Sequence, residues 1–413
     1  MPGNEERTQR GRMADIRERG FSDRASFDKA TAWVDAHGAT LMAKEIDLSE
    51  ATGRVLAEPV EAAWAIPPAD RASSDGYAVR SDDTVGAGDY NPLVLTLCHR
   101  EDALPPSAAA PIAAGESLPR GADAILPFES ARASGAALEV FSAAAEGRGV
   151  EREGQQIQAG TTLLDRARTL LPQDIGLIAS LGIQRVQVIR RPRVRLIVSR
   201  PKSHGELSPL GDANGPMLRA LVARDGGIVE AMILGTGQRA EIAQALAAPG
   251  ADMFLLAGRT GTGWDDEAPL AVAETGELAI HGIALRPGGS AGMGVVGTAP
   301  VLLLPGDPLD CFCAYELLAG RLVRRLAGRS PELPYPVREA EVGRKIVSAI
   351  GIVDLYRVCL VNGRAEAIGS AESGGLASTL RADGFVIVPA PLEGYAPGVR
   401  IPVHIYRRTN TTS

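Results

Sequence analysis

The chain has 413 residues, of which 45% are hydrophobic and 23% are charged, so two or three globular domains are expected and a disordered or collagen-like chain is excluded. No apolar run approaches the roughly 20 residues that span a bilayer, so we expect no membrane segment. The formal net charge is −7 and aromatic residues make up only 4%, which argues against a nucleic-acid partner.

The four cysteines favour a reducing compartment. They form no Cys-x-x-Cys motif, no His stands at zinc spacing, and the chain start does not resemble a signal peptide, so we expect a cytoplasmic protein. The pair Cys311 and Cys313 is open to two interpretations, a metal or redox pair and plain packing inside a helix. Packing is favoured, because cysteine is among the most buried residue types.

The first part of the chain predicts a tail, two helices and a β-rich stretch. Residues 1–25 are charged and lack apolar periodicity, which predicts disorder. Ser26 is a suitable N-cap for a helix from Phe27, and residues 48–57 place their apolar side chains on one side, which predicts a second helix. Short apolar runs separated by Gly and Pro then predict β structure over 60–149.

The middle of the chain alternates strand and helix patterns. Pro172 and Gly182 bracket a short predicted helix. Beyond it, strands are predicted at 194–198, 228–234, 253–256 and 301–304, and helices at 217–224, 239–247, 266–274 and 309–326. This alternation is typical of a parallel, doubly wound sheet, whose ligands bind at the carboxyl ends of the strands.

The last part predicts a small β domain, because Asn362-Gly363 separates two apolar runs as in a hairpin. The predicted fold class is a multi-domain α/β plus β protein, with a doubly wound α/β domain, a β-rich domain, a small linker domain and a C-terminal β domain. The predicted bounds are a disordered tail at 1–25, a discontinuous linker or dimerisation domain at 26–59 and 150–171, a β-rich domain at 60–149, an α/β domain at 172–330 and a C-terminal β domain at 334–408.

Two loops are candidates for binding an anion. Residues 257–263 (Ala-Gly-Arg-Thr-Gly-Thr-Gly) follow a predicted strand and precede a helix expected to open at Asp266. Backbone N–H groups in such a loop, together with a helix dipole, can hold phosphate or molybdate. The segment is neither a Walker A motif nor a dinucleotide fingerprint, and a plain tight turn is the alternative.

The second loop, residues 305–308 (Pro-Gly-Asp-Pro), also follows a strand and should converge with the first. Asp307 is a good helix N-cap, and this role is favoured over the alternative that Asp307 and Asp310 coordinate Mg²⁺. Asp75 lies in an Asp-Gly pair before a strand, where it is either a turn residue or a catalytic carboxylate.

Together these segments resemble the molybdopterin molybdenumtransferases, the bacterial MoeA proteins whose animal relative is the E domain of gephyrin. The likeness covers about 380 residues in one order. Its segments are L-S-E-A-T-G-R-V-L-A at 48–57, P-P-A-D at 67–70, S-D-G-Y-A-V at 74–79, G-A-D-A-I at 121–125 with Glu129, P-Q-D-I-G-L-I-A-S-L-G-I at 172–183, D-A-N at 212–214, A-L-R-P-G-G at 284–289, L-P-G-D-P at 304–308 and S-G-G-L-A-S at 373–378.

The resemblance implies an enzyme that hydrolyses adenylylated molybdopterin with a divalent cation, taken here as Mg²⁺, and inserts molybdate to give the molybdenum cofactor and AMP. It also implies a homodimer whose site lies between the α/β domain of one subunit and the β-rich domain of the other. A molybdopterin adenylyltransferase or a client molybdoenzyme would be further partners.

Site residues are carried over from the resemblance one at a time. The implied catalytic residues are Asp75, Asp266 and Glu206. The expected metal ligands are Asp75 and Asp266 together with Asp307, which stands where the family has an asparagine. The implied substrate-binding residues are Gly258, Arg259, Gly261, Gly263, Arg286, Gly288, Pro305, Gly306, Arg357 and Ser373. Trp264, beside the glycine loop, could stack on a pterin or adenine or seal a dimer contact, and His204 could be a base.

Several family positions differ in this chain. The two lysines of the family's K-P-G-K become Arg286 and Gly289, an Asn and a Ser become Asp307 and Asp310, and residues 235–238 (Gly-Thr-Gly-Gln) lack the usual aspartate. The favoured hypothesis is a transferase in which Arg259 and Arg286 bind the anion. The alternatives are a non-catalytic carrier or scaffold for molybdopterin, and an enzyme of this fold acting on another phosphorylated substrate.

Overall fold

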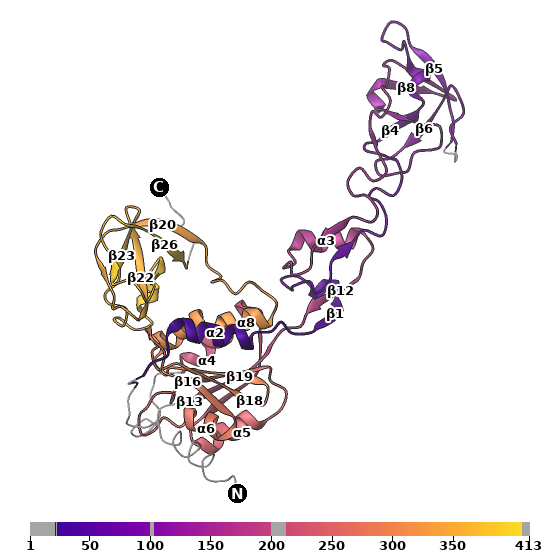
Figure 1. Ribbon diagram of the computed structural model, residues 1–413. Helices are drawn as coiled ribbons and strands as arrows, with labels where there is room; N and C mark the ends of the chain where they lie inside the picture. The colour runs from indigo at the N-terminus through magenta and orange to yellow at the C-terminus, as the bar shows by residue number, and fades with distance from the viewer. Residues whose placement is uncertain (1–20, 22, 100–102, 200–211, 407–413) are drawn as a thin grey trace. The chain divides into compact units, whose positions relative to one another are not determined.

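The computed structural model describes residues 21, 23–99, 103–199 and 212–406. Two compact units emerge (Figure 1). The larger unit comprises Met1–Ile46, Gly53–Ala57 and Gln187–Ser413, and the smaller unit comprises Asp47–Thr52 and Glu58–Val186. Each unit is described by itself below.

The smaller unit is built around a β-sheet, which confirms the β-rich prediction. Its strand order is β7-β4-β6-β5-β9-β8, with bounds β4 Gly76–Val79, β5 Leu93–Leu97, β6 Ala108–Ile112, β7 Ala124–Leu126, β8 Ala131–Ser134 and β9 Ala137–Val140. Val79, Leu95 and Leu138 are fully or almost fully buried in its core. Shorter pieces of this unit are η1 Leu48–Glu50, β2 Val60–Glu61, β3 Arg71–Ala72, η2 Ser81–Thr84, η3 Phe128–Ser130, β10 Val150–Glu151 and β11 Thr162–Leu164.

The predicted helix at 48–57 is wrong, because only η1 forms there, as a single 3-10 turn. The carboxylate of Asp47 accepts from the backbone N–H of Ser49 and closes a short turn, and Gly53 has a φ of 73°, through which a right-handed helix cannot continue. The apolar residues that suggested a helical face, Val55 among them, are buried without one.

The predicted helix after Pro172 is confirmed as α3 (Pro172–Ser180). Asp174 accepts from the backbone N–H of Leu171 at 2.9 Å and pairs with Arg168 at 2.9 Å, and Gly182 follows the end of the helix with a φ of 74°. These are the start and stop features that the sequence indicated.

The larger unit contains a sheet of order β14-β13-β15-β19-β18-β16. The bounds are β13 Arg193–Ser199, β14 Ile228–Gly235, β15 Met253–Ala257, β16 Glu277–His281, β18 Gly292–Val296 and β19 Ala299–Leu304. Pairing is parallel from β14 to β19, as predicted, but β18 and β16 are antiparallel. The sheet is therefore mixed. Its antiparallel part arises where a tight turn at Gly297 joins β18 and β19 in a hairpin.

Helices cover both faces of this sheet (Figure 1). Helices α2 (Phe27–His37), α4 (Asn214–Arg224), α7 (Pro308–Ala314) and α8 (Gly320–Leu326) pack on one face, and α5 (Arg239–Ala247) and α6 (Ala268–Thr275) pack on the other. Along β13, Val194, Leu196 and Val198 point to the first face and Ile197 to the second. Strands buried on both faces read as continuous apolar runs, which is why the sequence located them well.

The helix predicted at 309–326 is interrupted by a π-helical segment at Tyr315–Ala319, which separates α7 from α8. Cys311 and Cys313 are fully buried in the core between α7 and the sheet. Burial raises the pKa of both thiols above its ordinary value, so both remain protonated at neutral pH. The packing interpretation of this cysteine pair is therefore confirmed.

The C-terminal part of the larger unit is a second sheet of order β17-β22-β23-β20-β26-β24. The bounds are β17 Leu285–Arg286, β20 Val337–Val342, β22 Val353–Val361, β23 Arg364–Ala367, β24 Gly384–Val388 and β26 Arg400–Ile405. Elements outside this sheet are β12 Arg185–Ile189, β21 Ile346–Val347, β25 Gly394–Tyr395 and α9 Ser378–Arg381. The predicted hairpin is confirmed, since Asn362 and Gly363 take φ values of 51° and 78° between β22 and β23.

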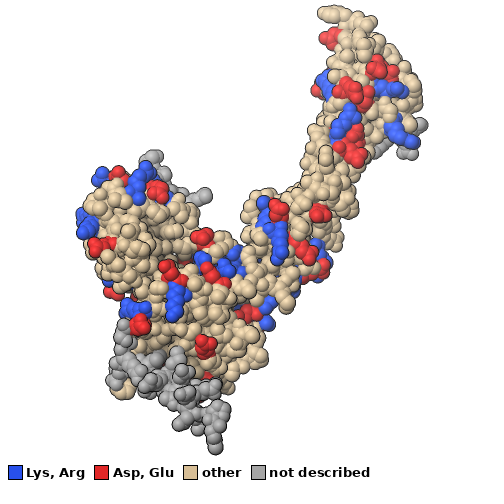
Figure 2. All heavy atoms as spheres, in the orientation of Figure 1, with Lys and Arg blue, Asp and Glu red and all other residues tan. Residues whose placement is uncertain are grey.

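Charged side chains of both signs are interspersed on the surface shown in Figure 2, without a broad field of one sign. Within the described part of the chain, no helix has the length and apolar character needed to cross a membrane.

Candidate functional site

The two candidate anion loops meet at the carboxyl ends of β15 and β19 in the larger unit. A Cβ added to Gly306 would lie 3.3 Å from Cα of Gly258, and one added to Gly258 would lie 2.9 Å from the carbonyl oxygen of Ser199. A side chain at Gly258 would collide with the end of β13, and one at Gly306 would press on Gly258, so the absence of side chains at these positions allows the close approach. Pro305 is buried beside them.

The glycine loop is anchored by a buried residue that the sequence did not single out. Thr260 donates its hydroxyl to the carbonyl of Leu304 at 3.0 Å, and its own carbonyl lies 2.7 Å from Nε2 of His281. Burial lowers the pKa of His281, which is therefore neutral near pH 7 and donates from Nε2 to the carbonyl. The loop is thus tied both to β19 and to β16.

The helix predicted to open at Asp266 begins later, since α6 starts at Ala268. Asp266 therefore belongs to the segment that continues the glycine loop. Its Oδ2 accepts from the backbone N–H of Gly263 at 2.7 Å, and a Cβ added to Gly261 would lie only 2.8 Å from the same oxygen. A carboxylate therefore occupies one of the backbone donors, the N–H of Gly263, that the sequence assigned to a substrate anion.

Asp307 caps α7, as favoured from the sequence, and accepts from the backbone N–H groups of Leu309 at 2.9 Å and Asp310 at 3.2 Å. Burial first and the charge of Asp307 second raise the pKa of Asp310. Gly288 packs directly against this turn, since a Cβ there would lie 3.2 Å from the carbonyl oxygen of Asp310. The start of α7 thus brings two carboxylates close together.

Asn214, at the start of α4, joins the site although it was quoted only as part of the D-x-N motif. Its Nδ2 donates to the carbonyl of Gly306 at 2.9 Å, and its backbone N–H donates to Asp212 at 3.0 Å. Its Oδ1 is buried and has no hydrogen-bond partner among the described residues. An asparagine two residues after an aspartate at a helix start was the available signal.

Arg259 has a φ of 54°, which is unusual for a residue other than glycine. Its Nη1 donates to the carbonyl of Asp265 at 2.8 Å, while its Nε is buried without a partner among the described residues. It lines a cavity of about 360 Å³ together with Arg239, which pairs with Glu267 at 2.8 Å. The guanidinium thus stands beside the glycine loop with part of its hydrogen-bonding capacity unused.

Arg286 is held elsewhere. It forms a bidentate pair with the fully buried Asp354, at 2.7 Å and 2.5 Å, and Ser348 donates to the same carboxylate at 2.7 Å. Its charge is therefore already neutralised by a residue of β22. This pairing restricts the anion-binding role implied for Arg286.

Arg357 organises the loop that carries Ser373. Its guanidinium is buried and donates to Oγ of Ser378 at 3.0 Å, to the carbonyl of Ser373 at 2.7 Å and to the carbonyl of Ala371. Ser373 donates its own hydroxyl to the carbonyl of Ser370 at 3.0 Å. The loop is therefore shaped by the arginine, with Ser373 at its exposed turn.

Two of the implied catalytic residues do not belong to the described part of the larger unit. Asp75 belongs to the smaller unit, where its Oδ1 accepts from the backbone N–H of Ala114, 39 residues away, at 2.7 Å, so both of its predicted roles stay open. Glu206 lies outside the described residues. Trp264 is 68% exposed next to the glycine loop, which leaves both of its predicted roles open.

The carboxylates of the site fit a divalent cation only in part. Within the residues that the structure describes, no group of three or more His, Cys, Asp or Glu side chains is placed to hold a metal ion. Asp266 and Asp307 each accept from backbone N–H groups. A Mg²⁺ ion held here would have to complete its octahedral coordination with substrate oxygens and water, as Mg²⁺ commonly does.

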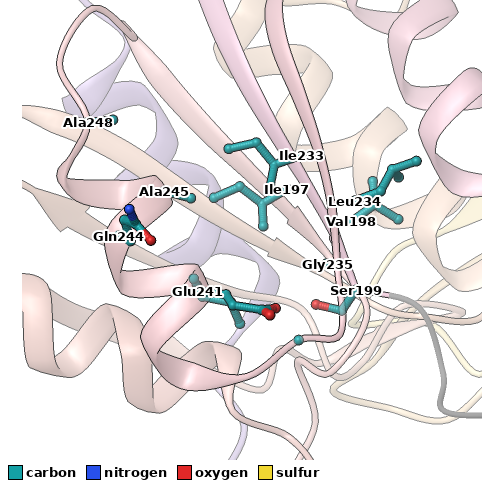
Figure 3. A pocket seen from close by; sticks show the side chains of 12 residues that line it. Ile197, Val198, Ser199, Ile233, Leu234, Gly235, Glu241, Gln244, Ala245 and Ala248 are labelled. Carbon is teal, nitrogen blue, oxygen red and sulfur yellow. The ribbon is translucent and has the colours of Figure 1, made fainter.

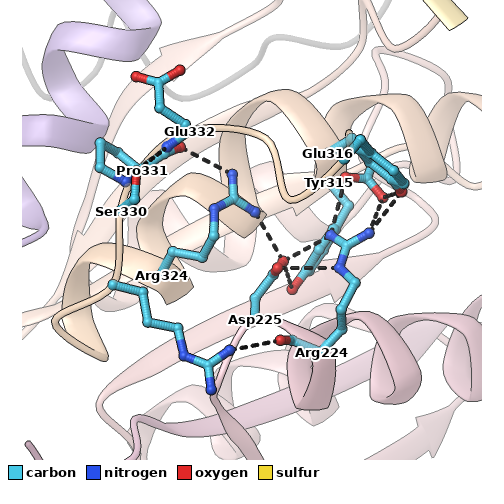
Figure 4. A network of polar contacts seen from close by, with 10 residues as sticks. Arg224, Asp225, Tyr315, Glu316, Arg324, Ser330, Pro331 and Glu332 are labelled. Carbon is cyan, nitrogen blue, oxygen red and sulfur yellow. Dashed lines mark hydrogen bonds and ion pairs between the residues drawn. The ribbon is translucent and has the colours of Figure 1, made fainter. Parts of the chain in front are cut away.

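A buried ionic cluster joins α4 to the π-helical segment behind the site (Figure 4). Arg224 binds Glu316 at 2.7 Å and 3.0 Å, Asp225 at 3.1 Å and 2.9 Å, and the hydroxyl of Tyr335 at 2.7 Å. Arg324 lies 3.1 Å from the carboxylate of Asp225. Burial alone would lower the pKa of Arg224, but the bonds to Glu316 and Asp225 raise it above its ordinary value. Arg224 therefore keeps its charge, which the carboxylates of Glu316 and Asp225 compensate.

The fold and the site define an α/β domain that carries glycine loops at the carboxyl ends of its parallel strands. A C-terminal β domain follows it. Family models match the chain in the same order: a MoeA N-terminal region (domain I and II) at 25–182, a probable molybdopterin binding domain at 202–325 and a MoeA C-terminal region (domain IV) at 339–406. The chain therefore belongs to the MoeA family, and the family resemblance seen in the sequence is confirmed.

Relatives match along almost the whole chain. A putative molybdopterin biosynthesis protein of Methanocaldococcus jannaschii is 27% identical over 94% of this chain and 97% of its own length. Molybdopterin molybdenumtransferase 2 of Mycobacterium tuberculosis is 29% identical over 87% of this chain and 94% of its own length. The crystal structure of a molybdopterin biosynthesis MoeA protein from Pyrococcus horikosii matches with a TM-score of 0.76 at 28% identity, covering 94% of this chain and 100% of that chain.

Proposed function

We propose that this protein is a molybdopterin molybdenumtransferase, an enzyme of molybdenum cofactor biosynthesis that inserts molybdate into adenylylated molybdopterin and releases AMP. The observation that carries the proposal is the meeting of two glycine loops at Gly258 and Gly306, the first of which also binds the carboxylate of Asp266 through the N–H of Gly263. Relatives of the same length that are named molybdopterin molybdenumtransferase support it.

The glycine loop would bind the pyrophosphate of the substrate. The N–H of Gly263 now donates to Asp266, and a phosphate oxygen is an equivalent acceptor that can replace this carboxylate. Arg259 adds a fixed positive charge beside the loop. Asp266, once displaced, is free to take a proton from the water that attacks phosphorus while the bond to the AMP oxygen breaks.

A divalent cation is part of the proposal. Asp266 and Asp307 would supply carboxylate oxygens, and Asp75 is retained as a further ligand from the β-rich domain, as the resemblance implies. A bound Mg²⁺ would neutralise charge on the substrate phosphates. The remaining Mg²⁺ ligands would come from the substrate and from water.

The cellular and quaternary setting is proposed on the resemblance alone. We propose a cytoplasmic homodimer that exchanges molybdopterin with a molybdopterin adenylyltransferase or a client molybdoenzyme. The domain bounds predicted from the sequence and the role of Glu206 as a catalytic residue are retained as proposals in the same way.

The test is AMP release from adenylylated molybdopterin in the presence of Mg²⁺ and molybdate. Asp266→Ala should slow the release by about a hundredfold or more, since a general base contributes a factor of this order. Glu274→Ala, which removes an exposed carboxylate from α6, is the matched control and should release AMP like the unchanged protein. Equal rates for both variants would exclude Asp266 from the reaction.

A further inference from the structure

Two successive glycines, Gly288 and Gly289, follow β17, and the first of them packs against α7. A Cβ added to Gly288 would lie 3.2 Å from the carbonyl oxygen of Asp310 and 3.3 Å from Cβ of Ala314. Gly289 stands where the related family has the second lysine of its K-P-G-K motif. The backbone at this place therefore carries no charged side chain of its own.

The side chain of Arg24 lies beside Gly289. A Cβ added to Gly289 would lie 3.2 Å from Nη1 of Arg24, 3.4 Å from its Cζ and 3.0 Å from the carbonyl oxygen of Leu285. Gly289 does not have a positive φ, so its backbone conformation does not demand glycine. The missing side chain instead leaves room for a guanidinium that comes from a distant part of the chain.

A short strand pairing fixes the backbone next to Arg24. Ala25 pairs in parallel with Ile283, in the segment between β16 and β17. The N–H of Ala25 donates to the carbonyl of Gly282 at 3.0 Å, and the N–H of Ala284 donates to the carbonyl of Ala25 at 2.8 Å. Arg24 is therefore anchored one residue away from two backbone hydrogen bonds.

An aromatic ring supports the guanidinium of Arg24. Its Cζ lies 5.7 Å from the centroid of the Phe21 ring, within the range of a cation–π contact. Phe21 in turn packs edge to face on His281, with 5.0 Å between the ring centroids. Because such a contact uses the face of the guanidinium, its N–H edges stay open to a ligand.

Arg24 keeps a charge that neighbouring arginines have already spent on the protein itself. Arg286 forms its bidentate pair with Asp354, and Arg357 donates to the carbonyls of the Ser373 loop. Among the residues that the structure describes, no carboxylate forms an ion pair with Arg24. A guanidinium carries five N–H donors in a geometry that matches the oxygens of an oxyanion.

We propose that Arg24 binds an oxyanion of the substrates and takes the place of the lysine that is absent at Gly289. The inference rests on the proposed function, which brings two such groups to the site, molybdate and the phosphates of adenylylated molybdopterin. Both are tetrahedral oxyanions, and a guanidinium binds their oxygens through charge-assisted hydrogen bonds. Arg24 is thus a substrate-binding residue that lies more than 260 residues before the glycine pair in the chain.

The position of Arg24 is distinct from the cavity beside α5. That cavity has a volume of about 410 Å³ and is lined by residues of β13, β14 and α5, among them Ile197, Ile233 and Glu241 (Figure 3). Neither Arg24 nor Gly289 lines it. A change in oxyanion binding that follows substitution of Arg24 can therefore be assigned to the glycine pair rather than to this cavity.

The experiment measures binding of molybdate and, in a separate titration, of AMP to the full-length protein by calorimetry. Arg24→Ala should weaken binding of one of these anions about tenfold or more, because charge-assisted hydrogen bonds are lost. A loss for molybdate alone would name molybdate as the ligand of Arg24, and a loss for AMP alone would name the substrate phosphate.

Arg132→Ala is the matched control. Arg132 is likewise exposed, and its Cζ lies 5.6 Å from the centroid of the Phe141 ring, so this variant also removes an arginine from an aromatic face. It should bind both anions like the unchanged protein. Unchanged affinity for both anions in Arg24→Ala would overturn the proposal.

A second pair of variants separates binding from a merely structural role. Arg24→Lys keeps the charge and should keep most of the affinity. Arg24→Ala combined with Gly289→Lys should recover most of the affinity lost in Arg24→Ala, because removal of the guanidinium clears the space that the lysine needs, apart from the contact of 3.0 Å with the carbonyl of Leu285. An Arg24→Lys variant that binds no better than Arg24→Ala would overturn the proposal.

The outcome is separable from the proposed function. Oxyanion binding that depends on Arg24, without AMP release from adenylylated molybdopterin, would keep the role of Arg24 and refute the transferase activity. AMP release together with unchanged oxyanion affinity in Arg24→Ala would keep the activity and refute the role of Arg24.

Discussion

At the scale of single residues, the two aspartates at the start of α7 have different roles. Asp307 accepts from two backbone N–H groups, whereas Asp310 is half-buried beside it and has a raised pKa. The sequence places two acidic residues in this turn where the family has none. Because one of them caps the helix and the other has a raised pKa, the number of acidic residues does not measure the negative charge open to a ligand.

Asp307→Ala should lower the free energy of unfolding by about 1 kcal/mol, the usual value of an N-cap. Asp307→Asn keeps a capping oxygen and should cost much less, which separates capping from charge. Urea unfolding of both variants measures this. Equal losses for the two variants would mean that the charge, rather than the cap, stabilises the turn.

Asp310→Asn should stabilise the protein in a pH-dependent way. Because burial raises the pKa of Asp310 above its ordinary 3.8, the native state binds this proton more tightly than the unfolded state does, and stability falls as pH rises through the folded pKa. The variant should therefore raise the melting temperature at pH 7 and have little effect near pH 4. A stabilisation that does not change with pH would contradict this assignment.

Residue types were predicted better than residue partners. Arg286 and Arg357 were expected only as substrate-binding residues, and their pairing with Asp354 and with the loop carbonyls follows from strand register, which the sequence alone does not fix. Asn214 was overlooked because its partner, the carbonyl of Gly306, is a backbone atom 92 residues away.

At the scale of elements, the turn after β14 and the glycine loop after β15 depend on each other. Gly237 has a φ of 79°, and a Cβ there would lie 2.2 Å from Cδ of Arg259. The turn after β14 and the loop after β15, whose strands flank β13 in the sheet, thus contact each other beside the proposed anion site.

Gly237→Ala should destabilise the protein more than Gly351→Ala. Gly351 has a similar φ of 86° but no atom within 4 Å of an added Cβ, so its variant reports backbone strain alone. Thermal unfolding compares the two, and Arg259→Ala combined with Gly237→Ala should remove most of the excess loss, leaving only the contact of 3.0 Å with Cβ of Ser199. Identical losses for the two single variants would show that Arg259 does not occupy the space above Gly237.

The ionic cluster behind the site should be sensitive to removal of one charge. Glu316→Ala leaves Arg224 buried without its bidentate partner and should cost about 3–5 kcal/mol. Glu341→Ala, which removes an exposed partner of Arg364, should change stability by less than about 1 kcal/mol. Urea unfolding measures both, and a small loss for Glu316→Ala would contradict the buried pairing.

Elements with a clear apolar period were predicted from the sequence, and those set by distant contacts were not. The helix predicted at 239–247 matches α5, because its buried face repeats regularly. The helix predicted at 48–57 failed because a local side-chain bond and a positive φ at Gly53 end the turn. The π-helical segment at Tyr315–Ala319 leaves no signature in an apolar pattern, since its residues are buried on every side.

At the scale of the whole molecule, the family assignment rests on the order of the segments. Three successive models of MoeA and molybdopterin-binding regions follow the chain from residue 25 to 406. The order of many short motifs could be read from the sequence. The site shared between two subunits stays a prediction, since Asp75 and Asp266 belong to different units.

The central claim is that this chain transfers molybdenum rather than carrying molybdopterin unchanged. The most direct measurement is to determine AMP released and molybdenum retained in the same reaction, with adenylylated molybdopterin, Mg²⁺ and molybdate. The account predicts equal amounts of the two products, both lost when molybdate is omitted or Asp266 is replaced by Ala. Molybdopterin retained on the protein, with neither AMP released nor molybdenum bound, would contradict it.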